Sequence, residues 1–445
     1  MNRRQFLAAI SATGAAYAQP GGRKPNIVLI LADDLGYADL GFTGATDIPT
    51  PNLDQLARTG IVFTNGYVSH PFCSPTRAGI MTGRYQQRFG HENNPIYDQE
   101  NYTAGLPTTQ TTVAQLLKAV GYSTGLVGKW HLGAASKFLP SERGFTDVFY
   151  FRGGGHDYFK QELSGNPREY LIPLERDSKP VSEPEYLTDA LAREAASFIR
   201  RRRAEPFFLY LAFNTPHTPI QTAPHHMEAV KHIGDEKRRG YGAMVVALDT
   251  AVGRVMRALT EHNLEENTLI VFLSDNGGPI QVTASRNTPF REGKGTVYEG
   301  GIRVPFLMRW HRKLKPGRYT HPVISLDLLP TFTALAGAKT PTNVEGVNLL
   351  PYVLGQKGSP PHERLYWRAG GGVSYAVREG RFKLARQAGG PEQLFDLESD
   401  PAETNDLSAA KPEVISKLRT AYEAWNKSNI APVFESPRPA AKKKG

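Results

Sequence analysis

The sequence is poor in the features that define several protein classes. A single cysteine among 445 residues excludes an internal disulfide framework. No apolar run is long enough to span a bilayer, and no internal repeat or low-complexity tract is present. The content of hydrophobic residues is ordinary at 40%, and glycine and proline are frequent. This composition fits a loop-rich α/β enzyme, and the length allows one large domain and a smaller one.

The net charge of +10 is not accompanied by a nucleic-acid-binding motif. The basic residues are scattered, apart from the runs at residues 200–203 and 442–444. We interpret these two runs as a solvated helix end and a frayed tail. A diffuse positive field would favour anionic substrates, and we expect no nucleic-acid partner.

The first twenty residues are typical of an export signal. An Arg-Arg-x-Phe-Leu order at residues 3–7 precedes a short apolar run, and Ala-Tyr-Ala at 16–18 supplies small residues for a peptidase. The order resembles a twin-arginine signal. Asn2 stands where Ser or Thr is usual and no Lys follows Leu7, so a Sec signal is the alternative. Residues 1–20 are therefore predicted to be removed during export to the periplasm or the extracellular space.

Apolar runs alternate with amphipathic segments over residues 24–355. This pattern predicts an α/β catalytic domain with a large, mostly parallel sheet sandwiched by helices. Strands are expected at 27–32, 207–213 and 269–273, and a further strand is expected to end at residue 128. Helices are expected at 52–59, 112–120, 186–203 and after residue 242.

The pattern changes to short alternating segments beyond a linker at 355–361. It predicts a C-terminal α+β subdomain over 360–431, with a small antiparallel sheet and one helix at 412–425. The Pro- and Lys-rich residues 432–445 are expected to be disordered.

Two predicted strands end in adjacent polar pairs. Asp33 and Asp34 follow the first buried strand, and Asp275 and Asn276 follow the strand at 269–273. Open α/β sheets bind ligands at the carboxyl ends of their strands. Each pair taken alone is also typical of a turn.

The lone cysteine opens the segment Cys73-Ser74-Pro75-Thr76-Arg77. Pro75 suits the first turn of a helix with Ser74 as its N-cap, so Cys73 would face the positive end of the helix dipole. Arg77 lies one turn away. These neighbours would stabilise an anion and lower the pKa of the thiol. The alternative is a buried structural cysteine.

The pattern Cys73-x-Pro75-x-Arg77, followed by Ala-Gly-Ile-Met-Thr-Gly-Arg, resembles the signature of formylglycine-dependent (type I) sulfatases of the alkaline phosphatase superfamily. This family includes bacterial arylsulfatases and carbohydrate sulfatases. In it, a formylglycine-generating enzyme oxidises the cysteine to an aldehyde. The resemblance extends to the strand-end acids and to residues 128–133, 293–305 and 393–405, and so to nearly the whole mature chain.

The resemblance implies that Asp33, Asp34, Asp275 and Asn276 bind a metal together with the oxidised Cys73. These hard oxygen donors suit Ca²⁺, with Mg²⁺ possible. Related phosphatases and phosphodiesterases commonly carry Asp-His at the second pair, so the asparagine argues against a two-zinc site.

The resemblance also implies roles for the cations and histidines of the site. Lys129 and Lys294, with the metal, would bind the sulfuryl oxygens, and His217 would contact and protonate the leaving oxygen. Arg77 would hold the hydrated aldehyde that attacks sulfur. His131, which projects to the same side of its strand as Lys129, is the candidate base for sulfate release.

These features predict an exported sulfatase acting on sulfated carbohydrates or aryl sulfates. Two alternatives remain: a phosphodiesterase or phosphonate hydrolase of the same superfamily, and a catalytically silent sulfoglycan-binding protein whose Cys73 stays unoxidised. Loops near the motifs also contain polar residues that could line a sugar pocket or be plain loop polarity: His91, Glu92, Asn93, His156, Asp157 and Arg286.

Overall fold

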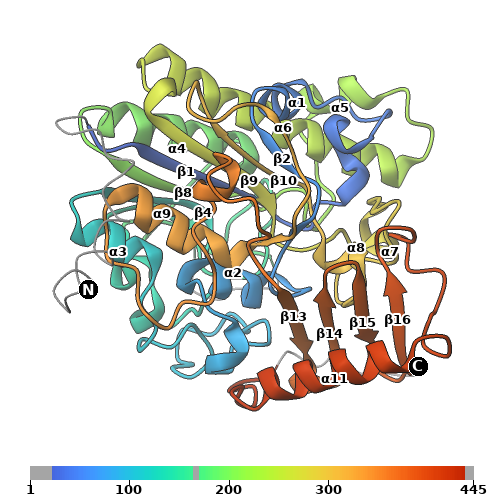
Figure 1. Cartoon of the computed structure of the whole chain (residues 1–445). Coiled ribbons are helices and arrows are strands. Elements are labelled where there is room, and N and C mark those ends of the chain that lie inside the picture. The colour runs from blue at the N-terminus through green and yellow to red at the C-terminus, as the bar shows by residue number, and fades with distance from the viewer. Residues whose placement is uncertain (1–22, 164–169, 436–445) are drawn as a thin grey trace, which may run out of the picture.

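The computed structural model describes residues 23–163 and 170–435. They form a ten-stranded sheet covered by helices on both faces and a separate four-stranded antiparallel sheet (Figure 1). The predicted α/β class with a small C-terminal sheet is confirmed. The export signal predicted at 1–20 lies outside the described residues. Within the described ranges, no helix combines the length and the apolar character needed to cross a membrane.

The large sheet is parallel at its centre and mixed towards its two edges. β9, β1, β8, β4 and β5 run parallel to one another, as their continuous apolar sequences predict. In sheet order the strands are β11 (Gly317–Tyr319), β2 (Ile61–Phe63), β10 (Phe306–Trp310), β9 (Thr268–Ser274), β1 (Asn26–Ala32), β8 (Phe207–Ala212), β4 (Ser123–Lys129), β5 (Asp147–Phe151), β6 (Leu174–Arg176) and β7 (Lys179–Val181). A separate pair is formed by β12 (Val323–Ile324) and β3 (Gly66–Tyr67).

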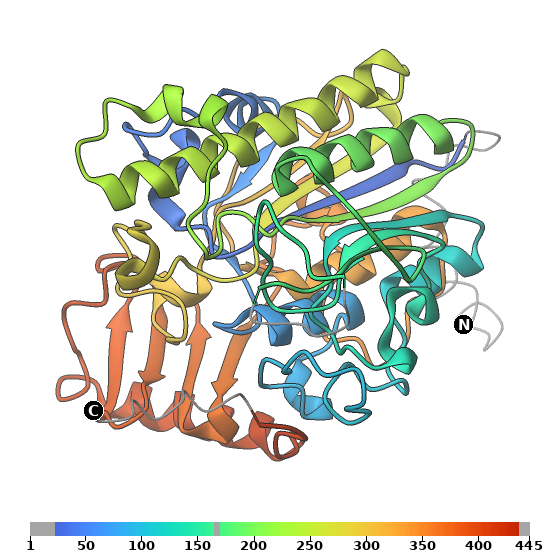
Figure 2. The same cartoon turned by 180° about the vertical axis from the view of Figure 1, so that it is seen from behind.

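Helices cover both faces of this sheet because its central strands are buried on both sides. Side chains of β1 alternate between two hydrophobic cores, with Leu29 in one and Ile30 in the other. One face is covered by α1 (Pro51–Arg58), α4 (Leu187–Arg202) and α6 (Glu236–Glu261), seen in front in Figure 2, and the other by α2 (Cys73–Thr82), α3 (Val113–Ala119) and α9 (Leu328–Ala336). The short helices are α5 (Pro224–Met227), α7 (Ile280–Thr283), α8 (Glu299–Ile302) and α10 (Leu350–Val353).

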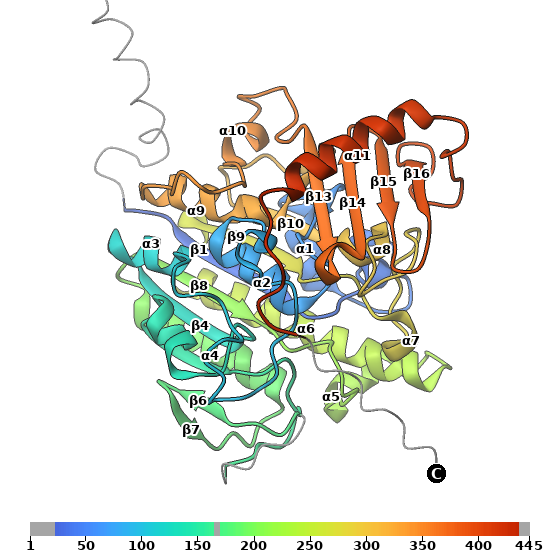
Figure 3. The ribbon, with the colours of Figure 1, turned by 90° about the horizontal axis from the view of Figure 1, so that it is seen from below.

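The C-terminal sheet packs directly against the catalytic domain. Trp367 of its first strand is buried against Tyr67 of β3, so both belong to one continuous core. Helix α11 (Pro412–Asn426) lies across the sheet (Figure 3). The strands are β13 (Arg364–Ala369), β14 (Ser374–Glu379), β15 (Phe382–Arg386) and β16 (Glu392–Asp396).

The start of the predicted tail is ordered by contacts with the catalytic domain. The Val433 amide donates to the Gly90 carbonyl at 3.0 Å, and the Asn93 side chain donates to the Phe434 carbonyl at 2.7 Å. Residues 432–435 are therefore held in place, contrary to the expectation from their composition, because the loop around Gly90 offers them backbone partners. Residues 436–445 lie outside the described part of the chain.

Candidate active site

Four adjacent parallel strands carry the predicted site residues at one edge of the sheet. Parallel neighbours end at the same edge, so residues far apart in the sequence meet there. β1 leads into Asp33 and Asp34, β9 into Asp275 and Asn276, β4 into Lys129 and His131, and β8 into the loop of His217. All of these side chains are buried.

Cys73 lies beside these strand ends as the first residue of α2. The predicted N-cap role of Ser74 is wrong, because the helix begins at Cys73, two residues earlier than expected, with Phe72 at the N-cap position. A proline is tolerated in the first helical turn. The Ser74 hydroxyl instead donates to the His131 carbonyl at 2.6 Å. The sulfur of Cys73 is 3.3 Å from Lys294 Nζ and 3.9 Å from Asp34 Oδ1. The cysteine thus faces the charged groups of the site.

Burial raises the pKa of the Cys73 thiol, although Lys129 and Lys294 lie near it. The prediction that the helix end and Arg77 lower this pKa is wrong, because desolvation of the buried thiolate outweighs both. Arg77 is directed to Asp275 instead, with Nη2 2.8 Å from Oδ2. A protonated thiol is a poor nucleophile, so this environment does not favour an unmodified cysteine as the attacking group.

Three buried ion pairs surround the cysteine. The three carboxylates and three cations carry formal charges that cancel, and Asp33 Oδ2 also lies 3.8 Å from Arg77 Nη2. A divalent cation added to them would leave a net positive site, which suits an anionic ester. The pairs are Asp33 with Lys129 at 2.5 Å, Asp34 with Lys294 at 2.7 Å and Asp275 with Arg77 at 2.8 Å.

The donor set fits a hard cation. Asp33 Oδ1 and Asn276 Oδ1 are buried and have no hydrogen-bond partner among the described residues, which is costly unless another group binds them. Ligand atoms of Asp33, Asp34, Cys73 and His217 lie within 4.8 Å of one another. Ca²⁺ or Mg²⁺ at this place would be held by the oxygens and not by the imidazole, because both ions prefer oxygen ligands.

The two histidines of the site are neutral around pH 7. Burial lowers the pKa of His217 to about 3, although Asp34 opposes the shift. Burial, Lys129 and Arg77 hold the pKa of His131 well below its usual range. The Nδ1 of His217 is 2.7 Å from the Thr218 carbonyl. In a neutral ring Nδ1 therefore donates, and Nε2 faces the reaction site.

The acids of the site have opposite pKa shifts. Burial alone would raise the pKa of Asp34, but Lys294, His217 and Asn276 outweigh it and lower the pKa. Burial and the neighbouring Asp33 raise the pKa of Asp275 to about 6. Such divergent shifts in one cluster are typical of functional sites.

Three residues that support the site were not predicted from the sequence. The Tyr158 hydroxyl lies 2.9 Å from the His217 carbonyl and fixes the backbone of that loop. Asn94 accepts the Ser74 amide at 3.1 Å. A Cβ on Gly154 would lie 2.7 Å from His131 Nε2. Only the glycine triplet at 153–155 gave a sequence signal, since such a run permits close approach of backbone and side chain.

The six loop residues considered for a sugar pocket direct their polar groups to the protein itself. His91 contacts the Ser74 hydroxyl, Glu92 pairs with Arg368, and Arg286 pairs with Asp47. The His156 ring contacts the Asp157 and Ile172 carbonyls. The Asn93 side chain donates to the Phe434 carbonyl, and the Asp157 carboxylate accepts a hydrogen bond from the side-chain amide of Gln221. These contacts favour the alternative that the six residues are ordinary polar residues of loops and do not line a sugar pocket.

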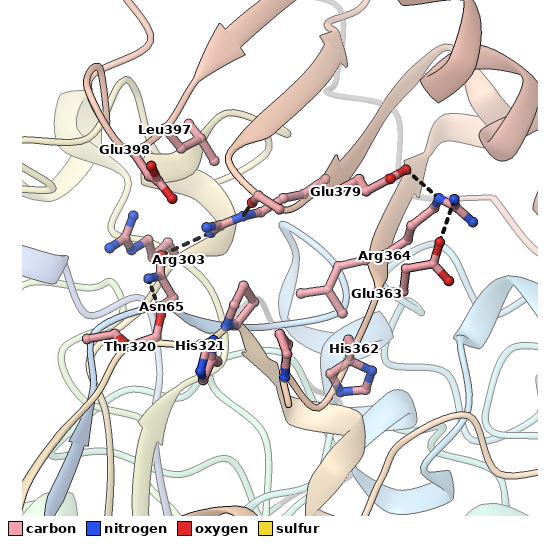
Figure 4. Close-up of a pocket in the computed structure, with 15 residues that line it drawn as sticks. Asn65, Arg303, Thr320, His321, His362, Glu363, Arg364, Glu379, Leu397 and Glu398 are labelled. Carbon is pink, nitrogen blue, oxygen red and sulfur yellow. Dashed lines mark hydrogen bonds and ion pairs between the residues drawn. The ribbon is translucent and has the colours of Figure 1, made fainter. Parts of the chain in front are cut away.

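A separate cavity of about 680 Å³ lies between the catalytic domain and the C-terminal sheet (Figure 4). None of the predicted site residues lines it. Its arginines are engaged by the protein: Arg364 pairs with Glu379, and Arg378 donates to the Asn65 side chain at 2.9 Å. None of the residues that line it carries an unpaired buried oxygen of the kind found around Cys73.

Comparison with known proteins identifies the family of the chain. The sulfatase family model matches residues 25–338, and the model for the C-terminal region of N-sulphoglucosamine sulphohydrolase matches residues 293–427. The chain is 36% identical to human arylsulfatase A over 94% of its own length and 89% of that protein. It is 34% identical to canine N-acetylgalactosamine-6-sulfatase over 79% of its own length and 70% of that protein.

Solved structures give the same result at the level of the fold. The crystal structure of Ps i-CgsB in complex with k-i-k-neocarrahexaose superposes with a TM-score of 0.88 at 40% identity, covering 93% of this chain and 95% of that one. The phosphonate monoester hydrolase of Agrobacterium radiobacter superposes with a TM-score of 0.68 at 20% identity, covering 91% and 96%. At that identity the likeness concerns the fold alone.

Proposed function

Because the chain belongs to the sulfatase family, and is thus a sulfuric ester hydrolase, we propose that it removes sulfate from sulfated carbohydrates by means of a formylglycine made from Cys73. The observation that carries the proposal is the position of Cys73. It lies within 3.9 Å of Asp34 and 3.3 Å of Lys294, among buried acids with unsatisfied oxygens. The carbohydrate class is supported by relatives whose names or titles refer to N-acetylgalactosamine-6-sulfate and a neocarrahexaose.

Each basic side chain has a distinct task in this proposal. Lys129 and Lys294 would bind sulfuryl oxygens, and Arg77 would hold the modified residue. Oxidation of Cys73 by a formylglycine-generating enzyme would supply, after hydration, the oxygen that attacks sulfur. The neutral imidazole of His131 would accept a proton during sulfate release.

His217 would donate a proton to the leaving oxygen through Nε2. Its pKa is low in the free protein because of burial. An arriving anionic ester adds negative charge beside the ring and would raise this pKa. The histidine would therefore become an acid only when substrate is bound.

A Ca²⁺ or Mg²⁺ ion would be held by Asp33, Asp34, Asp275 and Asn276 and would supply positive charge to the transferring group. Dialysis against a chelator should abolish most of the activity, and Ca²⁺ or Mg²⁺ should restore it. The melting temperature should also rise on adding the ion to the Cys73→Ala variant, which tests binding without turnover. A melting temperature that neither ion changes would contradict the proposed metal site.

The proposal is tested first by the mass of the peptide that contains Cys73. An aldehyde at this position supports it. A thiol in protein purified from its own host would favour the alternative of a catalytically silent binding protein.

A second test compares aryl and carbohydrate sulfates with matched phosphate monoesters, phosphodiesters and phosphonates. A higher kcat/KM for phosphodiesters or phosphonates would favour the alternative of a hydrolase for those substrates. We also propose export by the N-terminal signal, which is tested by locating the protein in fractionated cells.

A further inference from the structure

A cavity of about 560 Å³ adjoins the catalytic centre. It is lined by Lys294 and Thr296, by Glu292, and by the α7 residues Ile280, Gln281 and Val282. Lys294 lines the cavity and also belongs to the catalytic centre, because its Nζ lies 3.3 Å from Cys73 Sγ. A substrate whose sulfate binds at Lys294 can therefore extend into this cavity.

The wall formed by α7 is held in place by several hydrogen bonds. The Asn287 side chain donates at 2.8 Å to the carbonyls of Gly278 and Glu292. These two hydrogen bonds hold together the beginning and the end of the segment that connects β9 to Lys294. Lys237 Nζ donates to the Gln281 carbonyl at 2.6 Å. The side chains of α7 are thus presented on a fixed backbone.

Two of these side chains are apolar and exposed. Ile280 is 40% exposed and Val282 is 53% exposed. Single exposed apolar residues are common on protein surfaces, but two that line a cavity beside a reactive centre indicate a binding surface. The apolar C–H face of a pyranose ring is a suitable partner for them.

The charge of the cavity also restricts its occupant. Lys294 is already engaged by Asp34 and Cys73. Glu292 is exposed, and among the described residues its carboxylate forms no ion pair. A sulfate or carboxylate group placed beside Glu292 would be repelled. Gln281 and Thr296 offer polar groups for sugar hydroxyls.

We propose that this cavity is the subsite for an unsulfated, uncharged sugar unit joined to the unit that carries the scissile sulfate. The inference rests on the proposed carbohydrate sulfatase function. It assigns Ile280 and Val282 to packing against that neighbouring unit and Glu292 to rejecting an anionic one.

The packing role is tested with the double variant Ile280→Ala/Val282→Ala. Probes are p-nitrophenyl sulfate, N-acetylgalactosamine 6-sulfate and a carrageenan oligosaccharide. We expect kcat/KM for the oligosaccharide to fall about tenfold, through KM, with little change for the two small esters. Val373→Ala, at an equally exposed valine (55%) that does not line the cavity, is the control and should change none of the three. Equal losses on all probes, or no loss on any, would overturn the subsite.

The charge role is tested with Glu292→Gln. Wild-type protein should remove sulfate faster from an oligosaccharide whose neighbouring sugar is unsulfated than from one whose neighbouring sugar is sulfated. The ratio of the two kcat/KM values should be several-fold smaller for the variant, and added salt should reduce the same ratio for the wild type. An unchanged ratio would contradict the role of Glu292.

Failure of the subsite can be told apart from failure of the proposed function. If wild-type protein hydrolyses none of the sulfate esters, the function fails. Calorimetric titration of the carrageenan oligosaccharide into Cys73→Ala, with and without the two α7 substitutions, still tests the subsite. A weaker affinity caused by the α7 changes supports it, and an equal affinity opposes it.

Discussion

Two of the buried clusters of charged residues in the described part of the chain differ in how completely their atoms are paired. One surrounds Cys73. The other, here the junction cluster, joins α8 of the catalytic domain to the C-terminal sheet. It consists of Glu299, Glu403 and Lys383 with Tyr67, Arg303 and Arg378.

The carboxylates of the junction cluster are fully satisfied. Lys383 Nζ lies 2.9 Å from Glu299 and 2.8 Å from Glu403. The Tyr67 hydroxyl donates to the second oxygen of Glu299 at 2.6 Å, and the Glu299 amide donates to the second oxygen of Glu403 at 2.7 Å. Such closed networks hold a structure in place, and this one leaves no carboxylate oxygen of Glu299 or Glu403 unpaired for a cation.

The cluster around Cys73 also brings acids and cations together but leaves Asp33 Oδ1 and Asn276 Oδ1 unpaired. Unsatisfied buried oxygens are unfavourable for folding alone and useful for binding a cation. The comparison teaches that incomplete pairing, more than burial or charge, distinguishes a site from a structural joint. Changes at the first cluster should affect chemistry, and changes at the second should affect stability.

The largest effect is expected from Cys73→Ala. Turnover should fall by at least about 10⁴-fold, because the attacking group is lost. The melting temperature should stay close to that of the wild type, since the thiol donates to no group that depends on it for pairing. Steady-state kinetics and thermal unfolding measure the two effects. Residual activity near the wild-type level would exclude Cys73 as the source of the nucleophile.

Lys383→Met should be the most destabilising change at the junction. It leaves Glu299 and Glu403 buried together without their shared cation, which costs about 3–5 kcal/mol. Denaturant unfolding measures the loss, and kcat of the remaining folded protein should change little. Lys417→Met is the control, because its pair with Glu379 is exposed and contributes at most about 1 kcal/mol. Equal effects of the two substitutions would contradict a structural role of the junction cluster.

His217→Ala should slow hydrolysis by about 10²-fold for poor leaving groups and much less for good ones. The reason is that a good leaving group departs without a proton. A series of aryl sulfates of graded leaving-group pKa gives the measurement. A uniform loss across the series would oppose the role of general acid.

The smallest effect is expected at His362, beside the linker. Burial opposes protonation, but Asp327, 2.8 Å away, raises the pKa of His362. A raised pKa means that the folded state binds the proton more tightly than the unfolded chain. The stabilisation is then full below the unfolded pKa of about 6.5 and is lost as the pH rises through the folded value. The melting temperatures of wild type and His362→Gln should differ most near pH 6 and converge at pH 9, and a constant difference would contradict this linkage.

The central fold and the strand-end acids could be predicted because they depend on local signals. β1 and β9 are continuous apolar runs that end in polar pairs, and parallel strands bring such pairs together. The edge strand β11 and its neighbour β2 could not be predicted, because three residues carry no recognisable period. β13 was missed because it follows a linker rich in glycine and proline.

The chemistry of the site was predictable in kind but not in degree. Motifs indicated which residues meet, whereas the raised pKa of Cys73 depends on how completely the fold excludes water from it. Tyr158 could not be identified in advance, because its contact with the His217 loop spans elements distant in the sequence.

The burial of Cys73 has a consequence for the order of events in the life of the chain. Its side chain is 1% exposed once α2 is packed against the sheet. A macromolecular oxidant could not reach a sulfur that is buried in this way. Under the proposed function, oxidation of Cys73 would therefore come before α2 folds, and chains that fold early would remain as stable, inactive thiols.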